Sequence, residues 1–256
     1  MTSNPLTELR ENKTYAHVVP FAAFFLLNMA MSLGDQIKWE HPDAPWWRHW
    51  PEQWMYPIQT ILVLGTLVFY WKHYDLKWDS RVVFGGLMGV VGIGFWLLPT
   101  TLYDWMGYTE ESVGWLEYLG VMPRREGFDP MVLKDEFGIG GVFVSGFLRF
   151  FRAVIIVSLV EEILWRGFLM RFILNPDGDY WKVPFGKPDW RSYLIVTAAF
   201  ISIHQPVDFL GAFIYGSLTY WVAVKTKSLA ACITMHAVAN LLMGTYALYY
   251  GKFGLW

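Results

Sequence analysis

The sequence predicts an all-α fold, a polytopic transmembrane helical bundle of about seven spans, with a range of six to eight. Two features of its composition predict this. Of 256 residues, 55% are hydrophobic and only 16% are charged, against about 25% charged residues in a typical soluble domain. Aromatic residues make up 19% of the chain, and amphipathic rings collect where a bilayer meets water. We therefore expect an integral membrane protein with the lipid bilayer as its main partner.

Seven apolar stretches have lengths close to the ~20 residues that a helix needs to cross the hydrocarbon core. They run about Ala16–Leu33, Tyr56–Trp71, Val82–Pro99, Arg152–Phe172, Ser192–His204, Val207–Val224 and Leu229–Tyr249. The first is expected to be a retained span, because the residues before it show no pattern of a cleavable signal. The fifth is short and is followed by Pro206, so its turn into the sixth is expected to be submerged in the protein.

The fourth stretch reads as helical for longer than one crossing requires. Residues 138–174 would extend ~55 Å at ~1.5 Å per residue. We therefore expect Gly138–Phe151 to be an interfacial lead-in, with Arg149 and Arg152 as headgroup anchors. Before this lead-in, residues 100–137 are expected to form a long external loop.

Charged residues outside the spans predict the orientation. With a cytoplasmic N-terminus, the inside segments hold more Lys and Arg than the outside segments, as the retention of positive charge on the cytoplasmic side requires. We therefore expect the N-terminus in the cytoplasm. The net charge of -2 gives no indication of nucleic-acid binding. No feature of the sequence points to a particular oligomeric state.

The fourth span contains three charged side chains that membrane insertion disfavours by roughly 2.5–3.5 kcal/mol each. Glu162 and Arg166 are four residues apart, so they lie on one helix face and can form an ion pair. Glu161 is rotated by ~100° from Glu162 and points to a different neighbour. One carboxylate is therefore held by the arginine and another is free for chemistry. The alternative is a purely structural polar cluster.

Two later spans add polar groups at a similar depth. His204 follows Phe200 by four residues, and His236 precedes Asn240 by four residues on one helix face. Counted from the predicted cytoplasmic ends, Glu161 and these histidine and amide groups lie ~10–18 Å deep. Hydrogen bonding between packed helices would explain each group alone. Their agreement in depth favours a shared site.

This set of groups suits hydrolysis of an acyl group. A carboxylate such as Glu161, near an imidazole such as His204, can bind a water and remove its proton. His236 and Asn240 are donors suited to the oxyanion that then develops. A peptide bond is the obvious acyl group for an enzyme within a membrane, and a membrane protein or peptide is the expected substrate.

Three motifs on successive membrane segments resemble those of the CPBP family, which includes the type II CAAX prenyl endopeptidases and many bacterial relatives. They are Glu161-Glu162-x-x-x-Arg166, Phe200-x-x-x-His204 and His236-x-x-x-Asn240. The resemblance covers about Phe151–Tyr250. The chain is also similar to bacterial CAAX-protease-related proteins that accompany exosortase and PEP-CTERM sorting systems.

The resemblance implies roles for these residues. Glu161 and His204 would hold the attacking water, and His236 and Asn240 would form the oxyanion site. Glu162, Arg166 and Phe200 would be supporting residues. It also implies a site open to the cytoplasm and, for a bacterial relative, a place in the cytoplasmic (inner) membrane. Residues 1–150 would then hold the N-terminal membrane helices and 151–256 the catalytic helical core, within one integrated membrane domain.

Alternative interpretations remain open. The expected mechanism needs no cofactor, but Glu161, His204 and His236 could instead bind zinc, with an open fourth position for water. Cys232 lies four residues before His236 and on the same helix face as Asn240, so these three residues could instead form the site of a thiol peptidase. A small apolar cysteine is, however, usually a packing residue. A non-catalytic scaffold or immunity protein, or a transporter, could use the same polar layer for partners or ions.

Overall fold

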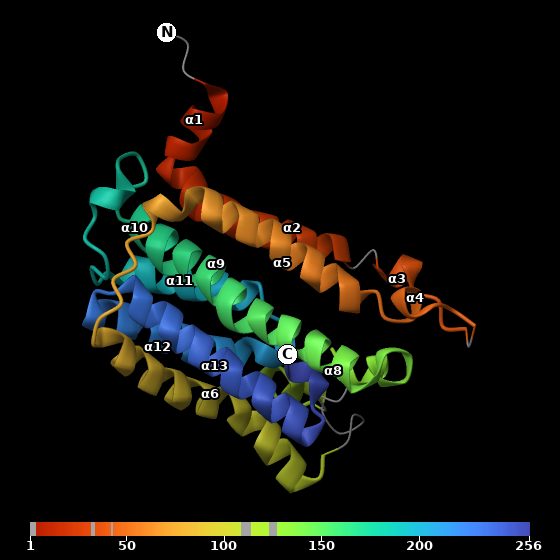
Figure 1. Ribbon diagram of the computed structural model, residues 1–256. Helices are drawn as coiled ribbons and strands as arrows, with labels where there is room; N and C mark the ends of the chain where they lie inside the picture. Colours follow the sequence, from red (N-terminus) through yellow and green to blue (C-terminus); the bar gives the residue numbers. More distant parts are fainter. Residues whose placement is uncertain (1–3, 32–33, 42, 109–113, 123–126) are drawn as a thin grey trace. The chain divides into compact units, whose positions relative to one another are not determined.

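The computed structural model describes residues 4–31, 34–41, 43–108, 114–122 and 127–256, and all regular structure within these residues is helical (Figure 1). Among these described residues, six helical stretches are long and apolar enough to cross a membrane. They are Lys13–Met31, Glu52–His73, Arg81–Met106, Pro130–Phe172, Pro206–Thr226 and Leu229–Tyr250. The prediction of an all-α polytopic membrane protein is confirmed.

Two predicted spans and one predicted loop differ from the structure. The fifth predicted span is α11 (Trp190–Ser202), whose 13 residues cover only ~20 Å of a hydrocarbon core ~30 Å thick. The third predicted span continues past Pro99, because α6 runs from Arg81 to Met106. The predicted loop 100–137 is therefore shorter at its start, and α8 (Lys134–Phe150) shortens its end. Residues 109–113 and 123–126 of this loop lie outside the described residues.

The predicted length of the fourth stretch is confirmed, because 43 residues, Pro130–Phe172, are helical except at Gly138. It bends at Gly138, where φ is 63° and ψ is -165°. Two seven-residue π-helical stretches, η4 (Phe151–Val157) and η5 (Ile163–Leu169), flank the short α9 (Ser158–Glu162). Wide turns of this kind are frequent at functional sites. The glutamate pair thus lies between two stretches of irregular helix.

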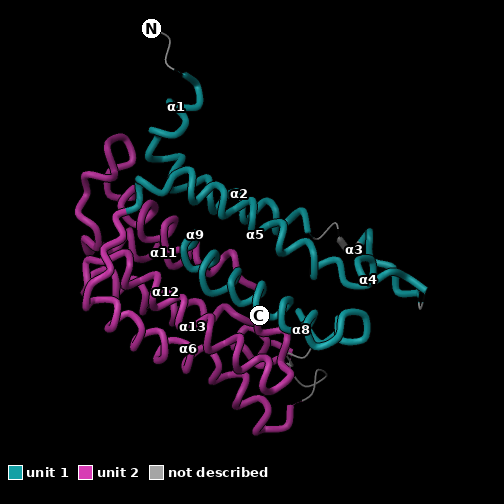
Figure 2. Tube along the Cα trace, viewed as in Figure 1, with its two compact units in different colours: residues 1–74, 128–161 teal, residues 75–127, 162–256 magenta. Residues whose placement is uncertain are grey.

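The chain divides into two compact units (Figure 2). Unit 1 comprises Met1–Tyr74 and Phe128–Glu161, and unit 2 comprises Asp75–Gly127 and Glu162–Trp256. One boundary therefore falls inside the long helical run, between the two glutamates. The predicted division into 1–150 and 151–256 follows the order of the chain and stays a prediction.

Unit 1 is built on α2 (Lys13–Met31) packed against α5 (Glu52–Tyr70). Its other elements are α1 (Pro5–Glu11), α3 (Gly34–Ile37), α4 (Trp46–His49), η1 (Trp71–His73), η3 (Pro130–Leu133), α8, η4 and α9 up to Glu161. Proline lies inside both α2 and α5, at Pro20 and Pro57. Membrane helices tolerate such prolines because neighbouring groups satisfy the freed carbonyls.

The predicted headgroup anchors in unit 1 are buried, which is a correction. Arg149 and Arg152 are each less than a tenth exposed. Arg152 donates from Nε to Gln59 Oε1 at 2.7 Å and from Nη2 to Asn28 Oδ1 at 3.1 Å. Its guanidinium also lies 4.3 Å from the ring centroid of Tyr56. Amide oxygens and an aromatic face hold this cation inside the unit instead of lipid headgroups.

Unit 2 contains α6 side by side with α12 (Phe209–Thr226) and α13 (Leu229–Tyr250) (Figure 1). Its other elements are η2 (Gly114–Leu119), η5, α10 (Met170–Phe172), η6 (Tyr180–Lys182), α11, η7 (Pro206–Asp208) and η8 (Phe253–Leu255). A Cβ on Gly85 of α6 would lie only 2.1 Å from the carbonyl oxygen of Ala231 on α13. Gly85 therefore serves the close packing of α6 against α13.

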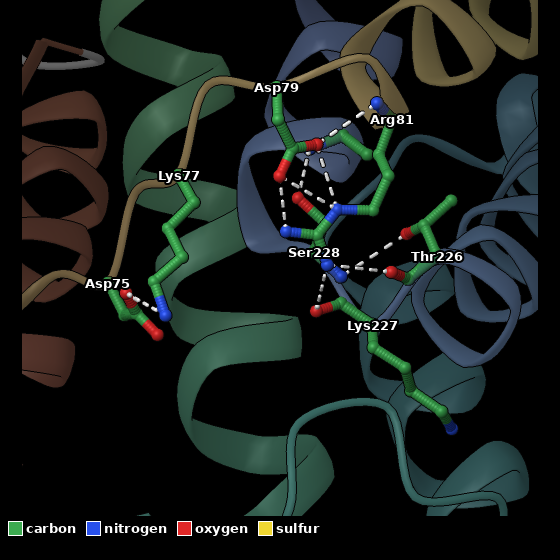
Figure 3. A network of polar contacts seen from close by, with 8 residues as sticks. Asp75, Lys77, Asp79, Arg81, Thr226, Lys227 and Ser228 are labelled. Atoms are coloured by element: carbon green, nitrogen blue, oxygen red, sulfur yellow. Dashed lines mark hydrogen bonds and ion pairs between the residues drawn. The ribbon is translucent and has the colours of Figure 1, made fainter.

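A polar network ties the start of α6 to the turn between α12 and α13 (Figure 3). Arg81 Nη1 donates to the carbonyl oxygens of Thr226 at 3.1 Å and Lys227 at 3.4 Å. The same guanidinium donates from Nε and Nη2 to the carboxylate of Asp79, which also accepts a hydrogen bond from Arg81 N. This arrangement lowers the pKa of Asp79 to about 2.

Candidate active site

Glu162 is the centre of the polar cluster in unit 2. Its Oε1 accepts a hydrogen bond from Arg166 Nη1 at 3.1 Å and another from His236 Nδ1 at 2.9 Å. Glu162 and Arg166 are 0% exposed. The predicted i, i+4 ion pair therefore forms, and it forms in a place without contact to solvent. Its link to His236 on α13 was not predicted.

Arg166 also connects the cluster to α11 and α12. Its Nη2 donates to the carbonyl oxygen of Gly216 at 3.3 Å. Its guanidinium carbon lies 5.4 Å from the ring centroid of Phe200, which is 1% exposed. The arginine is thus held by a carboxylate, a carbonyl and an aromatic face. The role of Phe200 as a supporting residue stays a prediction.

His204 lies two residues beyond the end of α11, in a bend. Its Nδ1 is 2.7 Å from the carbonyl oxygen of Phe200, one of the last carbonyls of the helix, which lack partners within it. A carbonyl can only accept, so Nδ1 is the donor. In the neutral ring, Nε2 then carries the lone pair. His204 is half-buried, which leaves that nitrogen suited to accept a proton.

His236 and Asn240 lie one turn apart on α13, on the same face of the helix. His236 is buried and Asn240 is half-buried. Because Nδ1 of His236 donates to Glu162, Nε2 carries the lone pair in the neutral ring. The spacing that the sequence shows is therefore preserved in an unbroken helix.

Glu161 belongs to unit 1, as its last residue. Its side chain is 8% exposed, and Oε2 has no hydrogen-bond partner among the described residues. A buried carboxylate oxygen without a partner is costly and is typical of functional positions. The pairing of Glu161 with His204 stays a prediction.

Two aromatic residues of the site were missed by the sequence analysis. Trp96 of α6 lies with its ring centroid 5.5 Å from that of His204, and Tyr215 of α12 lies 5.9 Å from that of His236. Aromatic residues in apolar helices carry no chemical signal of their own. The one available signal was their spacing, since each follows a glycine, Gly92 or Gly211, by four residues.

The structure also describes the residues on which the alternative thiol and metal mechanisms depend. Cys232 is 0% exposed, and it lies on α13 one turn before His236. Within the described part of the chain, no three His, Cys, Asp or Glu residues are grouped closely enough to hold a metal ion. The choice between metal-free and zinc chemistry stays open to experiment.

Comparison with known sequences finds a family model that matches part of the chain. The model of the type II CAAX prenyl endopeptidase Rce1-like family matches residues 143–242, less than half of the chain. Residues 143–242 are an Rce1-like domain. The predicted resemblance to the CPBP family is therefore confirmed, and all seven motif residues lie inside the Rce1-like domain. The seven are Glu161, Glu162, Arg166, Phe200, His204, His236 and Asn240.

The Rce1-like domain supports a protease of the membrane as the general class of this protein. A membrane-associated protein is then the general class of substrate. No curated protein and no solved structure matches the chain. The predicted link to exosortase systems stays a prediction.

Proposed function

We propose that this protein is an intramembrane endopeptidase that hydrolyses a peptide bond of a membrane-associated protein without a metal. Glu161 and His204 activate the water, and His236 and Asn240 stabilise the oxyanion. The observation that carries the proposal is the bond from His236 to Glu162 inside an Rce1-like domain. A structural polar cluster needs the Glu162–Arg166 pair, but it has no need of a histidine oriented by the same carboxylate oxygen.

The chemical step is an addition followed by an elimination. One proton of the water passes to Glu161 while the water oxygen bonds to the carbonyl carbon of the substrate. The oxyanion that forms accepts hydrogen bonds from His236 and Asn240. The C–N bond then breaks as the proton passes from Glu161 to the amine nitrogen. The products are a carboxylic acid and an amine, so atoms and charge balance.

The tautomers fit these roles. His204 donates from Nδ1 to Phe200, which leaves Nε2 to accept a hydrogen bond from the water. His236 donates from Nδ1 to Glu162, so it must carry a second proton to donate from Nε2 to an oxyanion. The carboxylate of Glu162 compensates the charge of that second proton. Arg166 donates to the same carboxylate oxygen, which is how two fully buried residues support the chemistry.

We also propose the cytoplasmic membrane of a bacterium, with the N-terminus in the cytoplasm, as the location of the protein. The motif residues would then lie nearer the cytoplasmic face. Accessibility labelling of single cysteines at exposed positions near each end tests this orientation. Labelling of the N-terminal end from outside intact cells would contradict it.

The experiment for the proposed function compares membrane proteomes of cells that carry the parent protein, Glu161→Gln or Glu136→Gln. Glu136 is an exposed carboxylate of the same long helical run, so it is the matched control. C-terminal fragments that appear with the parent and with Glu136→Gln, but not with Glu161→Gln, identify the substrate. Identical fragments in all three strains would favour a non-catalytic scaffold.

A further inference from the structure

The imidazole of His204 is enclosed by aromatic rings from two helices. The ring of Phe200, on its own helix, has its centroid 4.6 Å away at an interplanar angle of 49°. The ring of Trp96, from α6, has its centroid 5.5 Å away at an angle of 62°. Contacts at these distances and tilts are the preferred geometry of aromatic pairs.

Trp96 is held in place by a reciprocal contact between α6 and α12. A Cβ on Gly211 of α12 would lie 3.0 Å from the indole ring of Trp96. A Cβ on Gly92 of α6 would lie 2.8 Å from the ring of Tyr215 on α12. Each helix therefore offers a glycine on which the aromatic residue of the other helix rests. The two rings also meet each other edge to face, with centroids 5.9 Å apart.

His204 needs such support because its backbone has left the helix. Its side chain is fixed by one hydrogen bond, from Nδ1 to the carbonyl oxygen of Phe200. Rotation of the ring would break this bond and allow the other tautomer, in which Nε2 carries the proton. A second ring contact with the imidazole, from Trp96, opposes that rotation.

We infer that Trp96 is a positioning residue, whose contact with His204 keeps Nδ1 on the Phe200 carbonyl and Nε2 available to the reacting water. The inference deepens the proposed function and rests on it. Trp96 lies outside the Rce1-like domain, so it extends the site to α6. The Tyr215 ring, which contacts both Trp96 and His236, extends the same support toward the second histidine.

The test measures the tautomer of His204 directly. Protein labelled with ¹⁵N-histidine in detergent micelles gives the shifts of both ring nitrogens, and the spectrum of His204→Gln assigns this residue among the six histidines. The measurement is made near pH 8, about 1.5 units above the ordinary pKa of histidine, where neutral rings predominate. The parent is expected to show mainly the Nδ1–H form.

Four variants separate positioning from general damage. Trp96→Leu removes the ring, and Trp96→Phe restores a smaller one. Gly211→Ala leaves Trp96 in place but pushes its indole by a few tenths of an ångström. Gly94→Ala is the matched control for Gly211→Ala, because it too adds one Cβ. This Cβ lies on α6, two residues from Trp96, and meets no atom within 4 Å.

The ratio of the Nδ1–H to the Nε2–H form is expected to fall about 2- to 10-fold in Trp96→Leu, the equivalent of one aromatic pair. The fall is expected to be smaller in Gly211→Ala, largely reversed in Trp96→Phe and absent in Gly94→Ala. With a substrate, Trp96→Leu lowers kcat and leaves KM unchanged. An unchanged ratio in Trp96→Leu overturns the inference. If Trp96→Leu does not fold, an unchanged ratio in Gly211→Ala overturns it.

The two proposals can fail separately. A ratio that responds as expected in a protein with no hydrolytic activity would contradict the proposed function and leave the ring support standing. Hydrolysis that depends on Glu161, together with a tautomer ratio that does not change when Trp96 is replaced, would contradict only the inference about Trp96.

Discussion

His236 donates a hydrogen bond from Nδ1 to Glu162 Oε1 at 2.9 Å, across 74 residues of sequence and between two helices of unit 2. The same oxygen accepts a hydrogen bond from Arg166. A buried carboxylate shared by two donors fixes the position of both. The Glu162–Arg166 pair and His236 therefore form one hydrogen-bonded cluster.

The first prediction concerns the stability of the cluster formed by Glu162, Arg166 and His236. Glu162→Gln leaves the buried Arg166 without its counter-charge, and breaking a buried pair in this way costs about 3–5 kcal/mol. The double variant Glu162→Gln with Arg166→Met removes both charges and should lose less than the sum of the single variants. The free energy of unfolding in mixed micelles measures both effects. Strictly additive losses would mean that the pair contributes no coupling.

The second prediction concerns the role of Cys232, which is fully buried and stands one turn before His236. Cys232→Ala should keep kcat within about twofold of the parent, a change in the barrier of less than ~0.5 kcal/mol. The rate of substrate cleavage by folded protein is the measurement. Loss of activity in a variant with an unchanged unfolding midpoint would establish a thiol mechanism.

The third prediction concerns pH. The guanidinium of Arg81 lowers the pKa of Asp79 from 3.8 to about 2, first through the side-chain hydrogen bond and then through the bond from Arg81 N. A depressed folded-state pKa stabilises the protein above the unfolded value and ceases to do so as the pH falls toward 2. Asp79→Asn should therefore lower Tm at pH 6 and make little difference near the pKa of about 2.

The control for this pH effect is Asp75→Asn. Asp75 forms an exposed pair with Lys77 in the same network, at 3.5 Å, and exposed pairs contribute little (Figure 3). It should change Tm less than Asp79→Asn does at pH 6. Equal effects of the two variants at every pH would show that the Arg81 contact does not act through the ionised Asp79.

The fourth prediction concerns metal. Purified, active protein should contain less zinc than one atom per ten chains, roughly the level of adventitious metal, and should keep its activity in a strong chelator. Elemental analysis and a cleavage assay with and without the chelator are the measurements. Stoichiometric zinc, with activity lost on chelation and restored by zinc, would replace the metal-free mechanism.

Hydropathy was sufficient to predict the membrane helices but not their ends. The third predicted span ends at Pro99, yet α6 continues to Met106. The segment before His204 is apolar enough for a span, but its helix has only 13 residues. Composition measures preference for lipid, whereas the length of a helix is decided by packing and by the chain beyond it.

The site was predictable where its residues share a helix. The pairing of Glu162 with Arg166 follows from i, i+4 spacing alone, and it forms as predicted. The bond from Glu162 to His236 joins separate helices, so no local pattern could reveal it. The contact of Trp96 with His204 depends on how α6 packs against α12, through glycines whose partners only the structure identifies.

The most direct test of the account is the rate of peptide cleavage by purified Glu161→Gln, measured beside the parent and Glu136→Gln on the substrate found in cells. A general base contributes about 10²–10⁴-fold to such a rate, so Glu161→Gln should be slower by at least ~100-fold, while Glu136→Gln matches the parent. Equal rates for the folded Glu161→Gln variant and the parent would contradict the central claim that this carboxylate activates the water.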